Sequence, residues 1–96
     1  MFVAVWRYRV ADAQRARFEA AYGADGAWAR LFRLDPGYAG TELLGDGDGV
    51  YLTLDRWTDE AAWDRFKALH GDAYAELDAQ MESLTVEEER IGGFSA

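Results

Sequence analysis

The chain has no cysteine, one proline and one histidine among its 96 residues. The absence of cysteine excludes disulfide scaffolds, thiolate zinc sites, thiol nucleophiles and iron–sulfur clusters. With a single histidine, a transition-metal site would rest largely on carboxylates, and no clustering of acids favours one. The sequence therefore predicts no metal site.

Basic residues are also scarce: ten Lys and Arg stand against eighteen Asp and Glu, for a net charge of −8. Binding nucleic acid or an anionic membrane depends on clustered Lys and Arg, so neither partner is expected. No apolar run approaches the roughly twenty residues that span a bilayer. Phe2 to Val10 is interrupted by Arg7 and Arg9 and lacks a cleavage site, so it does not predict a signal peptide. The expected compartment is the cytoplasm.

Large aromatic side chains are what the sequence has in excess. Half of the residues are apolar and 15% are aromatic, including four Trp and five Tyr. A chain of this length forms one domain, here residues 1–96, and leaves much of its surface exposed. So many aromatics require a deep core, a ligand cavity or an interface.

Periodicity and turn residues predict the order β-α-β-β-α-β. The expected elements are a strand from Phe2 to Val10, a helix capped by Asp12 that runs to about Tyr22, a short helix from Ala27 to Leu34, strands Tyr38–Leu44 and Val50–Trp57 joined by a hairpin, a helix capped by Thr58 with a kink or break at Gly71, and an edge strand Leu84–Ile91. This order is the ferredoxin-like α+β arrangement, a four-stranded antiparallel sheet with helices on one face.

Alternation along the strands assigns side chains to the two sheet faces. The helix-facing set is expected to be Trp6, Tyr8, Leu52, Leu54 and Arg56. The other face would then carry Val3, Val5, Tyr51 and Trp57 among polar residues, which is too apolar for a face in water. A two-fold copy packed there would cover it, so the sequence predicts a homodimer.

Six segments carry a resemblance to a known family. They are Phe18–Gly23, Trp28–Arg33, Pro36–Tyr38, Thr41–Leu44, Tyr51–Trp57 and Thr58–Ala61. Together they resemble the antibiotic biosynthesis monooxygenase family of dimeric α/β-barrel proteins. The resemblance implies a ligand cleft between sheet and helices in each subunit, with two sheets forming a barrel. It also implies, for some members, oxidation of polycyclic phenols to quinones by molecular oxygen without a bound cofactor.

Other members of this family bind and degrade haem, and the sequence departs from their pattern at three positions. This chain has Trp6 where the haem-degrading branch has an Asn. The helical Trp of that branch corresponds to a position near Phe66 of this chain, and the iron-ligating His of that branch to a position near Glu76. Haem degradation is therefore disfavoured. The quinone-forming branch uses Asn, Trp, Tyr and Arg around its cleft, and this chain contains no Asn, so that polar set is not reproduced either.

Five residues are the candidates for contact with a flat aromatic ligand. They are Trp6 and Leu54 from the sheet, and Trp63, Phe66 and Tyr74 from the apolar stripe of the last helix. The alternative is that aromatics at helical spacing simply form the core, and this alternative applies most strongly to Trp63 and Phe66.

Three residues are candidates for catalysis: Arg56, His70 and Tyr8. Arg56 would stabilise a phenolate or a reduced-oxygen anion, or else pair with an acid from the second helix. His70 is the natural general base for a phenol, although a position beside Gly71 also suits a contact with free helix carbonyls. The Tyr8 hydroxyl would form a hydrogen bond with a phenolic ligand, or else have its hydrogen bonds satisfied at the rim of the cleft without one.

Three hypotheses about function remain open from the sequence. The first is a cofactor-independent monooxygenase of a small aromatic or polycyclic phenol. The second is a non-catalytic dimeric module that binds a small apolar molecule. The third is a structural or interaction protein whose aromatics serve only the core and the dimer interface.

Overall fold

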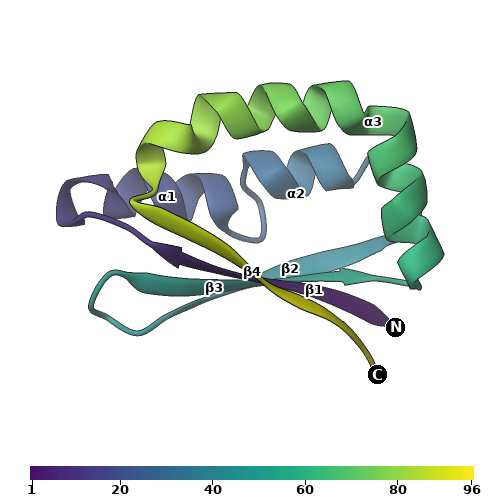
Figure 1. Cartoon of the computed structure of the whole chain (residues 1–96), viewed down its shortest axis with the longest axis horizontal. Helices are drawn as coiled ribbons and strands as arrows, with labels where there is room; N and C mark the ends of the chain where they lie inside the picture. The colour runs from purple at the N-terminus through teal and green to yellow at the C-terminus, as the bar shows by residue number, and fades with distance from the viewer.

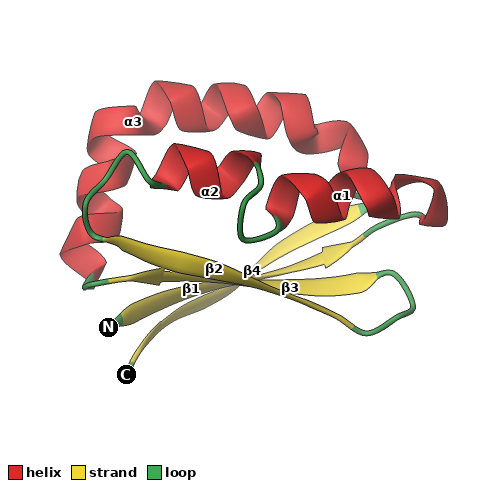
Figure 2. Ribbon diagram, turned by 180° about the vertical axis from the view of Figure 1, so that it is seen from behind, coloured by secondary structure: helices red, strands yellow, loops and turns green.

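The computed structural model describes residues 1–96, the whole chain. A four-stranded antiparallel sheet of order β2-β3-β1-β4 forms one layer, and the helices cover one of its faces (Figure 1, Figure 2). In chain order the elements are β1 (Phe2–Arg9), α1 (Arg15–Tyr22), α2 (Ala27–Phe32), β2 (Tyr38–Gly45), β3 (Val50–Trp57), α3 (Glu60–Met81) and β4 (Glu87–Ser95). The predicted ferredoxin-like α+β fold is confirmed. None of its helices is long and apolar enough to cross a bilayer.

Most element ends fall within a few residues of their predicted positions. The first helix opens with a 3₁₀ turn, Asp12–Gln14, and stops before Gly23, whose N–H donates to the carbonyl of Glu19. The prediction of Asp12 as N-cap was wrong, because Asp12 lies inside this turn and its carboxylate pairs with Arg15 at 2.8 Å. The last strand begins later than predicted, because the buried Leu84 ends a second 3₁₀ turn. β4 pairs only with β1, so the predicted edge position is confirmed.

The start and the middle of α3 are each set by local chemistry. Asp59, not Thr58, is the N-cap, and its carboxylate accepts a hydrogen bond of 2.8 Å from the backbone N–H of Ala62. The prediction of Thr58 was wrong because Asp at the next position caps at least as well. His70 has φ −123° and ψ 23°, outside the helical region, so the predicted kink beside Gly71 is confirmed.

The turn before β2 is held to α3 by a buried acid. Asp35 is 3% exposed and accepts hydrogen bonds from the backbone N–H of Gly37 (2.7 Å) and from Arg65 Nε (2.9 Å). The hydrogen bond from the Arg65 guanidinium holds the pKa of this carboxyl below its usual range. This ion pair fixes the start of β2 against the first half of α3.

β3 presents the opposite set of side chains to the helices from the one predicted. In the register of β1 with β3, Trp57 is opposite Phe2 and Asp55 is opposite Ala4, both of which are buried under the helices. Leu54 therefore lies on the outer face of the sheet. Tyr51 and Trp57 are the bulkiest side chains of β3, and the space under the helices accommodates them. In a period-two strand an error of one residue moves every side chain to the other face.

The outer face remains apolar despite this exchange. Its apolar side chains are Val3, Val5, Leu44, Leu52, Leu54 and Phe94. Leu44 is 43% exposed and Phe94 is 53% exposed, and both share this face with the other apolar side chains, as in an interaction surface. An apolar outer face was the reason for expecting a second copy to pack on it. The face is apolar in the structure too, although some of the residues that make it so differ from the predicted ones.

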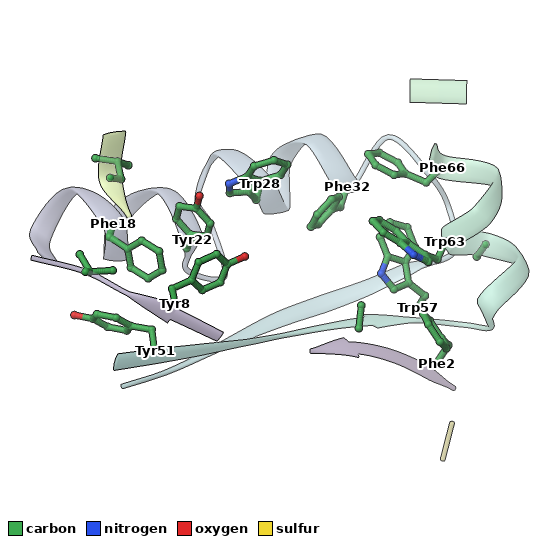
Figure 3. Close-up of a cluster of buried hydrophobic side chains, with 14 residues drawn as sticks. Phe2, Tyr8, Phe18, Tyr22, Trp28, Phe32, Tyr51, Trp57, Trp63 and Phe66 are labelled. Atoms are coloured by element: carbon green, nitrogen blue, oxygen red, sulfur yellow. The ribbon is translucent and has the colours of Figure 1, made fainter. Parts of the chain in front are cut away.

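The core between sheet and helices is a continuous layer of aromatic rings, drawn in Figure 3. Phe18, Trp57 and Phe66 are fully buried. Successive ring centroids lie about 4 to 6 Å apart, from the stacked Phe18–Tyr22 pair (4.2 Å) to the Trp57–Phe66 pair (5.4 Å). This layer runs along the sheet and contains the candidate site.

Candidate active site

A small cleft opens within the aromatic layer, between the sheet and the helices. Its lining residues are Trp6, Tyr8, Tyr22, Trp28, Phe32, Thr41, Thr53, Asp55, Tyr74 and Glu88. All four strands and all three helices contribute to this wall. The free space at its centre is about 20 Å³, room for one water molecule. The cleft is therefore nearly closed in this conformation.

Asp55 is the most deeply buried charged group of the cleft. It is 7% exposed and accepts a hydrogen bond of 2.7 Å from Thr41 Oγ1. The same Thr41 oxygen lies 2.5 Å from the Tyr38 hydroxyl. Burial raises the pKa of the Asp55 carboxyl to about 6, although the Thr41 hydrogen bond opposes this rise. The group thus changes charge close to neutral pH.

Three tyrosine hydroxyls surround the cleft. Burial raises the pKa of Tyr22 to about 12 and raises that of Tyr8 and Tyr74 further. Thr53 lies within hydrogen-bonding reach of the Tyr8 hydroxyl. All three phenols are therefore neutral at physiological pH and act as hydrogen-bond donors or weak acceptors.

The indole nitrogen of Trp28 has no well-formed hydrogen bond although it is buried. Figure 3 shows it turned toward the Tyr22 hydroxyl, with the Tyr8 hydroxyl below. A buried N–H without a partner costs about 1–3 kcal/mol. The nearest polar neighbour of the Trp28 nitrogen is the Tyr22 hydroxyl, whose pKa it helps to lower, and a ligand or a water in the cleft would give the indole N–H a better acceptor.

The charge of the cleft is negative. Its lining includes two carboxyl groups, Asp55 and Glu88, and no Lys, Arg or His. Burial, and then the nearby Asp78, raise the pKa of Glu88. No three His, Asp or Glu side chains of the chain lie in the arrangement of a metal site. An anionic ligand would meet repulsion here, whereas a neutral aromatic donor would not.

Of the five predicted ligand-contact residues, Trp6 and Tyr74 line the cleft. Trp63 and Phe66 do not: they stack on each other at 5.9 Å and pack against Trp57. Their structural position is that of core residues, which was the alternative from the helical spacing.

Leu54 and Arg56 were predicted to face the cleft and lie instead on the outer face of the sheet. Leu54 is opposite Val5 in the β1–β3 register, and Arg56 is opposite Val3. Arg56 Nη2 pairs with Glu42 Oε1 at 3.1 Å, and both side chains are partly exposed. The predicted orientation of Arg56 was wrong for the same reason as that of β3 as a whole, and its acid partner comes from β2, not from a helix.

The other two catalytic candidates separate. Tyr8 lines the cleft, but His70 does not. The His70 ring lies 5.4 Å from the Phe66 ring, at the kink of α3. It is close enough to Asp35 to help lower the pKa of that carboxyl. The only imidazole of the chain therefore packs beside the core at the kink of α3 and not in the cleft.

The sequence reasoning missed seven of the ten cleft residues: Thr41, Thr53, Asp55 and Glu88, and the helix aromatics Tyr22, Trp28 and Phe32. The first three were assigned no site because the faces of β3 were exchanged and β2 was not assigned to faces. Bulk was the signal that could have corrected this. Tyr51 and Trp57 fit a deep core better than Leu52 and Leu54 do, and their face includes Thr53 and Asp55.

Several solved structures share the fold over nearly the whole chain. SnoaB, a cofactor-independent oxygenase from Streptomyces nogalater, is 29% identical, with a TM-score of 0.72; the match covers 99% of this chain and 91% of that one. ActVA-Orf6, a monooxygenase of Streptomyces coelicolor solved with the ligand nanaomycin D, is 22% identical, with a TM-score of 0.75 and coverage of 99% and 86%. Rv0793 from Mycobacterium tuberculosis is 16% identical, with a TM-score of 0.69 and coverage of 99% and 93%.

No curated protein matches the sequence. The family model for antibiotic biosynthesis monooxygenases matches residues 1–76, which include the first three strands and most of α3. This match covers well over half of the 96 residues. The chain belongs to the antibiotic biosynthesis monooxygenase family.

Proposed function

We propose that the protein is a cofactor-independent monooxygenase of a small polycyclic phenol, which it binds in the cleft. One observation supports this most: a buried cleft walled by aromatic rings, with three phenols and two carboxyls converging on it. Flat rings suit the stacking surfaces, and hydroxyl groups suit the polar atoms. The similarity to SnoaB, a cofactor-independent oxygenase, supports the reaction class.

The substrate supplies the electrons in this reaction. Loss of a proton gives an electron-rich anion, and one of its ring carbons forms a bond to O₂. The resulting hydroperoxide then breaks its O–O bond and loses a C–H proton. For an anthrone, one CH₂ and one O₂ become one quinone C=O and one water. The four electrons that reduce O₂ all come from the substrate.

A substrate of this size requires the cleft to widen, since its free space is about 20 Å³. The second half of α3 is the element suited to move. It follows the kink at His70, and its cleft residue Tyr74 is only partly buried. A Cβ at Gly71, beside the kink, would meet no side chain or other element within 4 Å beyond its neighbours and its own helix backbone. Movement of this half would open the cleft without disturbing the buried start of α3.

The experiment is aerobic incubation of purified protein with anthrone, with quinone absorbance and oxygen consumption followed together. One quinone per O₂, dependent on protein and absent under nitrogen, is the expected result. Quinone formation no faster than in protein-free buffer would contradict the proposal for this substrate class. Arg56→Ala, on the outer face, serves as the matched control variant.

A binding module without catalysis is the second candidate, and one observation favours it. The cleft has no cationic side chain to stabilise a phenolate or a reduced-oxygen anion. Such a module would bind the phenol without consuming oxygen. The same incubation separates the two, because binding without oxygen uptake would select the module.

The apolar outer face supports a two-fold dimer, which we propose as the working assembly. Leu52, Leu54 and Phe94 are partly in water in the single chain. Fully covering a side chain of this size stabilises a protein by on the order of 1.5–3 kcal/mol. Light scattering is expected to give about twice the chain mass of 10.8 kDa. Leu54→Arg is expected to reduce this to one chain. A wild-type monomer at micromolar concentration would contradict the dimer.

A further inference from the structure

We propose that Asp55 is the group that receives the phenolic proton of a neutral aromatic ligand in the cleft, with Thr41 as its positioning residue. This inference rests on the proposed function for its role in turnover. Its contact with the ligand is testable without turnover.

The position of Asp55 is the first support. It lies on β3 near the centre of the sheet, and its carboxyl forms part of the cleft wall while only 7% of the residue is exposed. The Asp55 carboxylate accepts one hydrogen bond from the chain, which Thr41 Oγ1 donates at 2.7 Å. A carboxylate has about four lone-pair sites, so acceptor capacity remains for a ligand hydroxyl.

The surroundings of Asp55 make it the strongest acceptor available. The titratable groups around it are Tyr8 on β1, Tyr22 on α1, Tyr38 on β2, Tyr74 on α3 and Glu88 on β4. The phenols stay protonated, because burial raises their pKa values. Glu88 belongs to an edge strand and is itself exposed. Asp55 is therefore the buried base of the cleft.

Its protonation behaviour fits the task. A base that changes charge close to neutral pH is ionised in the cell and still strong enough to accept a proton from a phenol in the transition state. In the reaction above, Asp55 accepts the proton of the ligand hydroxyl, which an anthrone presents in its enol tautomer, as the ring carbon becomes electron-rich. Addition of O₂ to that carbon gives a peroxide anion, and Asp55 returns the proton to it, forming the hydroperoxide and ending as a carboxylate. The C–H proton and the hydroxide released from the O–O bond then form the water.

The same arrangement defines the ligand class. Asp55 is ionised at neutral pH, Glu88 contributes a second carboxyl group, and no cation lines the cleft. A phenol without a carboxylate or phosphate is accepted, and an anionic aromatic is repelled. 1-Naphthol and 1-hydroxy-2-naphthoic acid are therefore a matched pair of probes, and 1-methoxynaphthalene is a probe that lacks the phenolic donor.

Binding under nitrogen tests the contact apart from any oxidation. Calorimetric titration with 1-naphthol between about pH 4.5 and about pH 8 is expected to show affinity falling several-fold as pH drops through about 6, where the carboxylate is lost. Asp55→Asn should remove this dependence, and 1-methoxynaphthalene should not show it. Glu88→Gln should retain it. A pH dependence that survives in Asp55→Asn, or that disappears in Glu88→Gln, would overturn the proposal.

Turnover of anthrone tests the proton transfer. Asp55→Asn is expected to lower kcat by about a hundredfold or more while changing KM little. Glu42→Gln, which removes an acid from the outer face of the neighbouring strand, is the control. Thr41→Val removes the hydrogen bond that stabilises the carboxylate, so the acid limb of kcat/KM should move to higher pH.

The outcomes are distinguishable. Full turnover in Asp55→Asn would overturn the role of Asp55 and leave the monooxygenase proposal standing. A wild-type protein that binds 1-naphthol with the expected pH dependence but does not oxidise anthrone would remove the oxidation and support the Asp55 contact.

Discussion

The two ends of the aromatic layer are built from similar residues and have opposite properties. At the packed end, Trp57, Trp63 and Phe66 contact one another with centroids 5.3 to 5.9 Å apart, and Phe32 lies between this end and the cleft. At the polar end, Tyr8, Tyr22, Trp28 and Tyr74 surround the cleft with Asp55.

Polar atoms make the difference between the ends. The packed end has one unpartnered polar atom, the Trp57 indole nitrogen, which lies among rings at steep angles. The polar end brings together phenol hydroxyls, an indole N–H and a carboxyl whose pKa is raised by burial. Buried polar and titratable groups whose hydrogen bonds are not all made within the chain are typical of sites where a ligand makes the missing ones. An aromatic core residue and an aromatic site residue are therefore distinguished by the polar groups around them.

The largest expected effect is on stability at the packed end. Phe66→Ala deletes a fully buried ring and should lower the free energy of unfolding by about 3–5 kcal/mol. Phe66→Leu should cost about 1–2 kcal/mol, and it serves if the alanine variant does not fold. Urea denaturation measures both. A cost below about 1 kcal/mol for Phe66→Ala would contradict the description of this end as packed core.

At the polar end, Asp55→Asn is expected to stabilise the chain. The folded pKa of about 6 lies above the ordinary 3.8, so the folded state binds more protons between these values. Stability conferred by the protonated form is therefore lost as pH rises toward 6. At about pH 8, Asp55→Asn should raise the free energy of unfolding by on the order of 2 kcal/mol.

Denaturation at about pH 8 and about pH 4.5 measures this difference, with Glu42→Gln as the exposed control. The advantage of the asparagine variant should shrink at the lower pH. A variant less stable than the wild type at both pH values would show that the ionised carboxyl is structural, and would remove the contrast between the two ends.

A smaller effect is expected from a single hydroxyl of the polar end. Tyr74→Phe keeps the ring contacts with Trp28 and Trp63 and removes one polar atom from the cleft. We expect unfolding free energy to change by less than about 1 kcal/mol and 1-naphthol affinity to fall about two- to tenfold. Calorimetry and denaturation together check this. A stability loss without an affinity change would place Tyr74 in the core.

The smallest effects are expected outside both ends. His70→Ala and Arg56→Ala alter side chains that do not line the cleft, so anthrone turnover should stay within about twofold of the wild type. Steady-state kinetics measure this. A tenfold loss of kcat in His70→Ala, with unchanged unfolding free energy, would return the imidazole to the site.

The sequence was sufficient for the fold because each element carried its own signal. The Gly and Asp turn at 45–49, the stop at Gly23 and the stripe of α3 all act locally. The residues of the cleft depend on register, which is not local. Leu52 and Leu54 are apolar like Tyr51 and Trp57, and although bulk favours the two aromatics for the core, the pairing with β1 is what establishes it.

The site was accordingly predictable in part. Trp6 and Tyr8 were placed by the alternation of β1, which has small Ala4 and large Phe2 on the same buried face. Asp55 was not predicted, because a charged residue in an alternating strand ordinarily faces water. Its burial is visible only when β2 brings Thr41 within hydrogen-bonding distance.

The indole N–H resonances test the contrast between the two ends most directly. The four Trp side chains give four such signals: Trp6 and Trp28 line the cleft, and Trp57 and Trp63 belong to the packed end. Single Trp→Phe variants assign them. On titration with 1-naphthol under nitrogen, we expect the Trp6 and Trp28 signals to shift together and saturate, with Trp57 and Trp63 nearly unmoved. Shifts confined to Trp57 and Trp63, or no shift at a saturating concentration of the phenol, would contradict the assignment of the polar end as the ligand site.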